Sequence, residues 1–276
     1  MFFPVFKNPN IQNNNNNNNI KNDFKQWISI LIASYNTQEE YLIACLDSIQ
    51  SQKGNFSIEL VWINDGSNEE FTNILEKQLL NFEYQTKKKE KQVKVQYIKM
   101  AENKGLSYCL HHGILSCTYD LIFRMDADDI MHETRILKQL NFMNQNPKCV
   151  LCGTNIVSFV IHNGEMRYVE KSSHPDILRW EDYIQTKKFW ILNHPTLCFR
   201  KYAIISVGNY ELNLKNPYED LDLELRILKK YGFVCNIEEI LLYYRIHENQ
   251  ITWMNRKNSK ENNELKKALI EKIINS

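Results

Sequence analysis

The chain has 276 residues, 43% of them hydrophobic, so it can bury a full core in one large domain or in a domain with a smaller addition. Its 34 lysine and arginine residues nearly balance its 33 aspartate and glutamate residues. This balance excludes a general electrostatic footprint for nucleic acid or for an anionic membrane surface, so the function must lie in local sites.

The N-terminal residues and the cysteines predict an ordinary intracellular protein. Residues 1–25 contain seven consecutive asparagines and are expected to form a disordered lead-in. No charged start precedes an apolar run, and no stretch approaches the ~20 apolar residues that span a bilayer. Most of the seven cysteines lie beside apolar residues, which favours a reducing compartment over a zinc site. We therefore expect a cytoplasmic location, with possible peripheral contact to a membrane's cytoplasmic face.

The first half of the chain alternates between strand and helix patterns. Four apolar runs have the length of buried strands: 27–33, 58–63, 93–98 and 121–125. Three helices are expected between them: 39–52, 69–80 and 106–117. This alternation predicts an α/β fold with a mostly parallel sheet and helices on both faces. Ligands of such sheets gather at the carboxyl ends of the strands.

The pattern becomes mixed after Asp129. The expected elements are a helix at 133–144, a hairpin at 156–169 turning at Asn163-Gly164, a helix at 221–230 ending at Gly232, and strands at 234–237 and 241–245. We predict a first part at 26–150, a smaller mixed part at 151–255, and a C-terminal helix at 256–276.

Three carboxylates follow the strand at 121–125, namely Asp126, Asp128 and Asp129. They repel one another unless a cation or strong hydrogen-bond donors compensate their charge. Hard oxygen ligands suit Mg²⁺ or Mn²⁺ shared with substrate phosphates, and the ion would neutralise a departing diphosphate. The alternative is that Asp129 or a neighbour caps the helix near Glu133. Capping accounts for one aspartate but not three, so the cluster predicts a metal site.

The Asp65-Gly66-Ser67 segment follows the strand at 58–63. By itself it is a turn signature. Its position at the same sheet edge as Asp126 favours a nucleotide contact, in which the carboxylate accepts the imide N–H of a uracil. Lys104 is a candidate donor-phosphate contact, although exposed loop lysines usually contact nothing.

Acidic residues also precede the helix at 221–230. Glu219 and Asp220 could simply stabilise the helix, because their negative charges interact favourably with the positive N-terminal end of its dipole. Their functional interpretation is a general base that takes the proton of an attacking hydroxyl. The residues alone do not separate these two carboxylates from Asp222 and Glu224.

Many of these motifs occur together in a fixed order. They are Ser29–Asn36, Leu46–Gln50, Ile63–Ser67, Asn103–Gly105, His112–Ile114, Arg124–Asp129, Arg135, His194–Thr196, Phe199–Lys201, Val207–Tyr210, Glu219–Asp220 and Tyr244–His247. This series, over about residues 27–250, resembles the family 2 inverting glycosyltransferases. The resemblance implies a GT-A fold, in which a nucleotide-binding α/β domain is continuous with an acceptor-binding region. Residues 26–150 would then form the nucleotide-sugar-binding part, and residues 151–255 the acceptor-binding part with the catalytic base.

The resemblance also implies roles for single residues on the donor side. Residues that would line the base and ribose are Ala33, Tyr35 and Asn36, and Asp65 would contact the base. Asp126 would contact the donor, and Asp128 would bind Mn²⁺ or Mg²⁺. Arg245 and His247 would lie near the diphosphate, with His247 also a candidate metal ligand. Asn64 stands where many relatives carry another aspartate, which would change nucleotide affinity.

On the acceptor side, Asp220 matches the catalytic base, with Glu219 beside it. A single base permits direct attack with inversion and no covalent intermediate. His194 and Arg200 are expected to shape the acceptor pocket, while Trp180 and Trp190 either stack on a sugar or pack in the core.

Two other functions are alternatives to sugar transfer. A sugar nucleotidyltransferase would need a glycine-rich loop after the first strand, and Ser34–Thr37 is not one. A catalytically silent nucleotide-sugar-binding protein would be favoured by the loss of Asp126, Asp128 or Asp220, and all three are present. The sequence therefore predicts metal-dependent transfer from a nucleotide-sugar, with a UDP-sugar expected, to a hydroxyl of a glycan, protein or small molecule.

Overall fold

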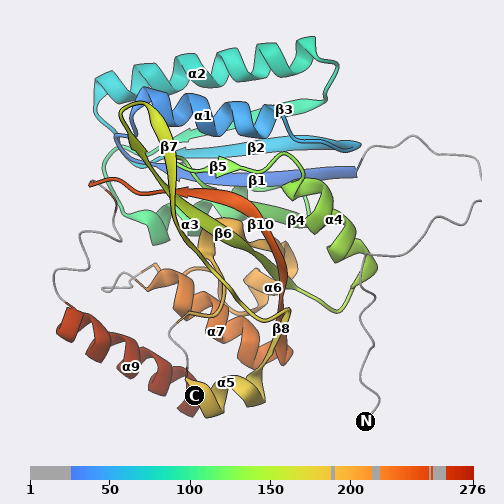
Figure 1. The fold of residues 1–276 in the computed structure, drawn as a ribbon, viewed down its shortest axis with the longest axis vertical. Helices are drawn as coiled ribbons and strands as arrows, with labels where there is room; N and C mark the ends of the chain where they lie inside the picture. Colours follow the sequence, from blue (N-terminus) through green and yellow to red (C-terminus); the bar gives the residue numbers. More distant parts are fainter. Residues whose placement is uncertain (1–25, 188–189, 213–217, 249, 251–258) are drawn as a thin grey trace, which may run out of the picture.

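The computed structural model describes residues 26–187, 190–212, 218–248, 250 and 259–276 (Figure 1). The predicted lead-in at 1–25 and the start of the predicted C-terminal helix lie outside these residues. The strands are β1 (Gln26–Ser34), β2 (Phe56–Asn64), β3 (Val93–Lys99), β4 (Leu121–Asp126), β5 (Ile130–Met131), β6 (Leu151–His162), β7 (Glu165–Lys171), β8 (Ile177–Arg179), β9 (Cys198–Arg200) and β10 (Phe233–Arg245).

The α-helices that the structure describes are α1 (Glu39–Gln50), α2 (Glu69–Lys88), α3 (Leu106–Ser116), α4 (Arg135–Gln145), α5 (Trp180–Thr186), α6 (Lys201–Ser206), α7 (Glu219–Tyr231) and α9 (Ser259–Asn275). A short 3₁₀ helix, η1, covers His194–Thr196. Within the described residues, all the strands belong to one sheet. Its main path runs β3-β2-β1-β4-β9-β6-β10-β5, while β7 pairs with β6 and β8 pairs with β10.

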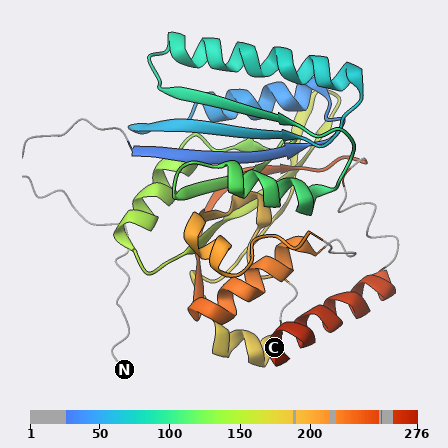
Figure 2. The same cartoon turned by 180° about the vertical axis from the view of Figure 1, so that it is seen from behind.

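The first four strands of the path are parallel, as their continuous apolar runs predict. Ala33 of β1 pairs with Ile63 of β2 on one side and with Asp126 of β4 on the other. This register brings the carboxyl ends of three strands to one edge. Seen from behind, α3 lies in front of these strands and α1 beyond them (Figure 2).

Side chains of β1 alternate between two cores because successive residues of a strand point to opposite faces. Ile30 and Ile32 belong to a core that also contains residues of α1, α2 and α4, whereas Leu31 belongs to a second core with residues of α3, α6, α7 and α9. Every residue of β2 is buried, as expected for a strand covered on both faces. The structure thus confirms the predicted α/β architecture with helices on both sides of the sheet.

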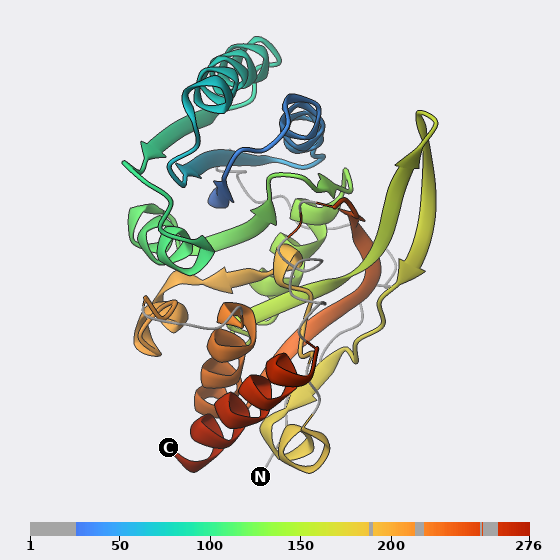
Figure 3. The same ribbon diagram turned by 90° about the vertical axis from the view of Figure 1, so that its left-hand side faces the viewer.

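The second half is more regular than its sequence pattern indicates. The predicted strands at 234–237 and 241–245 are one strand, β10, whose register with β6 shifts between Ile237 and Leu242. The predicted hairpin is confirmed, and it projects from the body as β6 and β7 (Figure 3). Its turn residues Asn163 and Gly164 both have positive φ, as a type I′ turn requires.

All seven cysteines are free and buried, which agrees with their predicted use as small apolar residues. Cys149 and Cys152 have the C-x-x-C spacing that zinc sites also use. Among the described residues, however, the group of side chains with metal-ligand spacing consists of aspartates alone. No helix in the described part of the chain is long and apolar enough to cross a membrane.

Position 66 requires glycine for two reasons, its positive φ of 67° and the close approach of neighbouring backbone. A Cβ at this position would lie 2.3 Å from the carbonyl carbon of Glu102, whereas one at Gly164 would meet nothing within 4 Å. We predict that Gly164→Ala costs ~1–2 kcal/mol of unfolding free energy, from backbone conformation alone. Gly66→Ala is expected to cost ~3 kcal/mol or more because backbone must also move. Urea unfolding of both variants measures this; equal losses would contradict the predicted clash.

Candidate active site

A cavity of about 810 Å³ opens at the carboxyl ends of β1, β2 and β4. Its size lies within the range of small-molecule sites. One end is lined by residues that follow the parallel strands: Ala33, Ser34, Tyr35, Asn36, Thr37, Asp65, Asp126 and Asp128. The other end is lined by residues of the second half: Trp190, Leu192, His194, Tyr218, Glu219, Asp220, Asn262, Asn263 and Lys266. The cavity is therefore lined by residues from both halves of the chain.

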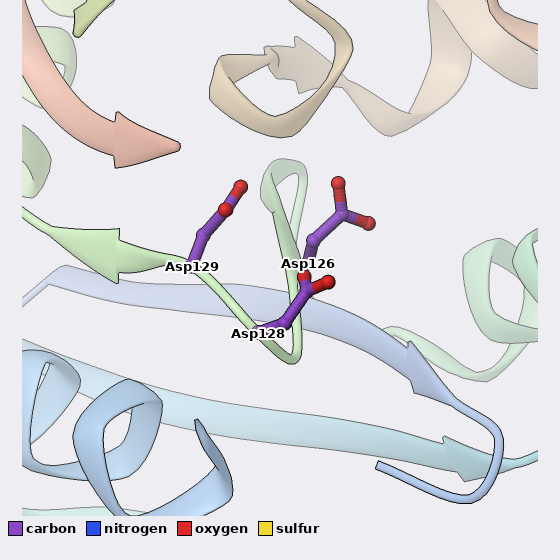
Figure 4. Close-up of side chains that lie close together, drawn as sticks. All are labelled: Asp126, Asp128 and Asp129. Atoms are coloured by element: carbon purple, nitrogen blue, oxygen red, sulfur yellow. The ribbon is translucent and has the colours of Figure 1, made fainter. Parts of the chain in front are cut away.

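Asp126 ends β4, and Asp128 and Asp129 follow it on the tight loop that leads to β5 (Figure 4). One carboxylate oxygen from each lies within 4.8 Å of the others. Asp129 is fully buried, whereas Asp126 and Asp128 are partly exposed and line the cavity. Asp129 does not cap α4, because the residue before that helix is Thr134. The alternative of a simple helix cap is therefore wrong.

Burial and mutual repulsion both act on this loop. Burial raises the pKa of Asp129 well above its ordinary value, and the charges of Asp128 and Asp126 raise it further. The pKa of Asp126 is also raised by burial, although the guanidinium of Arg124 opposes the shift. Asp129 Oδ1 accepts a backbone N–H, but its Oδ2 is buried with no partner among the described residues. The loop thus concentrates negative charge that its neighbours only partly compensate.

Arg245 and His247 of the predicted Tyr244–His247 motif brace this loop. The Arg245 backbone N–H donates to Asp129 Oδ1 at 2.9 Å, and its Nε donates to the Asp128 carbonyl at 2.8 Å. Its guanidinium also stacks on the Tyr41 ring at 4.3 Å. His247 Nε2 lies 2.9 Å from Asp128 Oδ2 and lines the cavity, whereas Arg245 lies behind the loop.

Arg124 stands in the Arg124–Asp129 motif, but the sequence predicts no role for it. It is buried, and its guanidinium makes a bidentate ion pair with Asp126 at 2.7 and 2.5 Å. Burial raises the pKa of Glu219, Asp220 and Glu224, and the charge of Arg124 opposes this rise in all three. An arginine within the apolar run of β4 was the signal available in the sequence, since a buried cation needs a partner.

The end of β1 is tied to the loop after β2. The Asn36 backbone N–H donates to Ser67 Oγ at 2.9 Å, and Asn36 Oδ1 accepts the Asn68 N–H at 3.0 Å. Asn36 has a φ of 47°, a conformation that asparagine tolerates better than most residues. These bonds hold Ala33 and the half-exposed Tyr35 at the cavity wall.

Asp65 connects β2 to the start of α3. Its two carboxylate oxygens accept the backbone N–H groups of Lys104 and Gly105, at 2.7 and 2.9 Å. Asp65 also lines the cavity. The Lys104 ammonium instead contacts Glu102 at 2.5 Å, and its side chain is not part of the cavity lining.

Asn64 makes hydrogen bonds that require an amide side chain. It is fully buried and lies outside the cavity lining. Its amide nitrogen donates to Thr72 and Tyr97, while its amide oxygen accepts the Ser67 N–H. A carboxylate would lose both donations, so the amide suits this position irrespective of the nucleotide.

Asp220 and Glu219 stand at the first turn of α7 and face the cavity. Burial raises the pKa of Asp220, against a hydrogen bond from the Leu221 N–H and the charges of Arg124 and Lys266. The pKa of Glu219 is raised to about 7 by burial and by the charge of Asp220. A carboxylate with a raised pKa is a stronger base, which suits general-base catalysis near neutral pH.

The remaining acceptor-side candidates separate into two groups. His194 lines the cavity, contacts the Tyr210 hydroxyl at 2.8 Å, and has its pKa lowered by burial and by Arg124. Trp190 lines the cavity with 58% of its surface exposed. Arg200, by contrast, donates to the Cys149 and Met143 carbonyls. Trp180 stacks on Tyr183. Neither Arg200 nor Trp180 belongs to the cavity lining.

Comparison with known proteins identifies the family. Residues 29–211 match the family described as Glycosyl transferase family 2. The chain belongs to this family. The amylovoran biosynthesis glycosyltransferase AmsE of Erwinia amylovora is 30% identical to this glycosyltransferase over 218 residues, which cover 79% of this chain and 75% of AmsE. The family match includes Asp65 and the aspartate loop but ends before Asp220 and His247.

Solved structures confirm the predicted GT-A fold. TarS 1–349 of S. aureus in complex with UDP-GlcNAc aligns with a TM-score of 0.63 at 15% identity, over 82% of this chain and 60% of that one. The mannosyltransferase PcManGT of Pyrobaculum calidifontis, in complex with GDP-Man and Mn²⁺, gives 0.59 at 12% identity, over 85% and 61%. The present chain thus spans about three fifths of these two structures.

The raised pKa of Glu219 predicts a pH dependence of stability. Its folded value of about 7 exceeds its ordinary value of 4.5, so the folded state binds more protons between these values. Stability from this group is therefore lost as pH rises through that window. In EDTA, we expect the unfolding free energy of Glu219→Gln to rise relative to that of wild type as the pH increases from 5 to 8. Urea titrations test this with Glu165→Gln on exposed β7 as control; parallel pH curves for wild type and Glu219→Gln would contradict it.

Proposed function

We propose that the enzyme transfers a sugar from a UDP-sugar to a hydroxyl acceptor, with inversion and with the help of Mn²⁺ or Mg²⁺. The observation that supports this most directly is the placement of Asp128 and Asp220 in one cavity. One carboxylate belongs to a loop with metal-ligand spacing, and the other begins a helix on the opposite wall. A transferase needs both functions at a single site.

The aspartate loop has a donor set that fits a divalent cation. Clustered carboxylate oxygens suit Mg²⁺ and Mn²⁺, and the buried Oδ2 of Asp129 has no partner among the described residues. Asp126, Asp128 and His247 would hold the ion. When bound, the ion would supply positive charge that stabilises the leaving diphosphate. Arg124 fixes the Asp126 carboxylate in place through its bidentate pair.

The end of the cavity that contains Asp220 supplies the general base for the transfer. Asp220 takes the proton of the acceptor hydroxyl while the hydroxyl oxygen attacks the anomeric carbon of the donor. The bond from that carbon to the diphosphate oxygen breaks, and UDP leaves with the electron pair. Attack from the face opposite the leaving group inverts the configuration. Asp65, Tyr35 and Asn36 would bind the nucleoside at the other end, where they line the cavity.

Turnover of nucleotide-sugars by wild type and two variants tests this proposal. With Mn²⁺, one donor of a panel that includes UDP-sugars and GDP-mannose is expected to release its nucleotide. Asp220→Asn should lower kcat by ~10²–10⁴-fold because it removes the general base. Asp128→Ala, and EDTA with wild type, should abolish release.

Asp120→Asn serves as the matched control, since Asp120 is half-exposed and pairs with Arg200 outside the cavity. It should retain wild-type turnover. Full activity of Asp220→Asn with every accepted donor would rule out its role as base. Undiminished turnover in EDTA would rule out the metal.

A further inference from the structure

The C-terminal helix α9 supplies part of the cavity wall although it lies beyond the segment that matches the family. Asn262, Asn263 and Lys266 of α9 line the cavity. The helix lies against α7, which begins with the two acidic residues of the active site (Figure 3). An element outside the shared family segment, placed at the reaction site, is suited to set specificity rather than the common chemistry.

The docking of α9 is specific. Its residues Leu269, Ile270 and Ile273 are buried in the core that α7 also enters. Lys229 of α7 donates to the Ile273 carbonyl at 2.8 Å. At the other end, the Tyr218 hydroxyl donates to the Asn262 carbonyl at 3.1 Å. Apolar packing and hydrogen bonds at both ends therefore hold the helix at the cavity mouth.

Lys266 is the unusual residue of this wall. Only 8% of its surface is exposed, and lysines are rarely so buried. Its ammonium lies 4.1 Å from the ring centroid of Trp190 and 4.8 Å from that of Tyr218. These cation–π contacts offset part of the cost of desolvation. Burial lowers the pKa of Lys266, and the nearby Asp220 opposes this shift.

The position of Lys266 relative to Asp220, the proposed general base, determines which substrate Lys266 faces. An acceptor hydroxyl must come within hydrogen-bond reach of Asp220. Lys266 is close enough to Asp220 for their charges to interact, and Trp190 lies against Lys266. The nucleotide end of the cavity is formed by other residues, at the ends of β1 and β2. The Lys266 wall therefore faces the acceptor.

We propose that Trp190, Asn262 and Lys266 form the acceptor subsite, that its occupant is a sugar ring, and that Lys266 selects that sugar. This rests on the proposed function. A sugar presents apolar C–H faces and a rim of hydroxyls. An exposed indole provides a flat apolar surface, while an amide and an ammonium donate hydrogen bonds to hydroxyl oxygens. The combination fits a glycoside better than a lipid or an isolated hydroxyl.

The test compares Lys266→Met with wild type. Methionine keeps an apolar stem but removes the ammonium. Acceptor probes are methyl glycosides of glucose, galactose, N-acetylglucosamine, xylose and fucose, with glycerol and N-acetylserine amide as non-sugar hydroxyls. We expect wild type to use a glycoside, and Lys266→Met to raise the KM for it by ~10-fold or more, the loss of a hydrogen bond to a charged group. Lys266→Arg should recover part of the loss.

Neighbouring Lys267, exposed on the same helix, provides the matched control. Lys267→Met should have the wild-type KM, and calorimetry should give the same affinity for UDP with Mn²⁺ in all four proteins. Equal KM values for Lys266→Met and Lys267→Met would overturn the proposal. So would transfer to glycerol or N-acetylserine amide, or donor hydrolysis alone, when no glycoside is used. Wild type that fails to bind UDP with Mn²⁺ would instead overturn the proposed function itself.

Discussion

The repulsion among the three carboxylates of the Asp126–Asp129 loop is the constraint around which the active site is built. Two arginines oppose it from the protein side. Arg124 neutralises Asp126 through a buried bidentate pair, and Arg245 braces the backbone of the loop. Asp129 nevertheless keeps a buried oxygen without a partner among the described residues. Because the arginines neutralise only part of the negative charge, the loop is suited to bind a cation that arrives with the substrate.

The sheet places this charged loop in the wall of the cavity. Parallel strands end at one edge of the sheet, so the pairing of β1 with β4 places Asp126 beside Ala33. The second half then brings α7 and α9 to the opposite wall of the cavity. Arg124 links the two ends electrostatically, since its charge acts on Asp126, Glu219 and Asp220. In the proposed mechanism, donor binding and proton transfer would therefore both depend on the buried guanidinium of Arg124.

Sequence patterns predicted the first half well because its strands are continuous apolar runs and its polar clusters stand at their ends. The short strands β5, β8 and β9 could not be predicted, since two or three residues carry no periodicity. Asp65, Asp128 and Asp220, three of the candidate residues, all line the cavity. Lys266 was missed because it lies in a charged helix whose pattern does not reveal which lysine turns inward. Lys104 shows the reverse case, in which a motif residue contributes mainly its backbone.

Calorimetric titration of UDP into the wild-type protein, once with Mn²⁺ and once with EDTA, tests the central claim most directly. If the aspartate loop holds a cation that meets the diphosphate, UDP should bind with Mn²⁺ and ~100-fold more weakly in EDTA, a difference on the order of 3 kcal/mol. The same affinity in both buffers, or no binding in either, would contradict the account of the loop as a metal–diphosphate site.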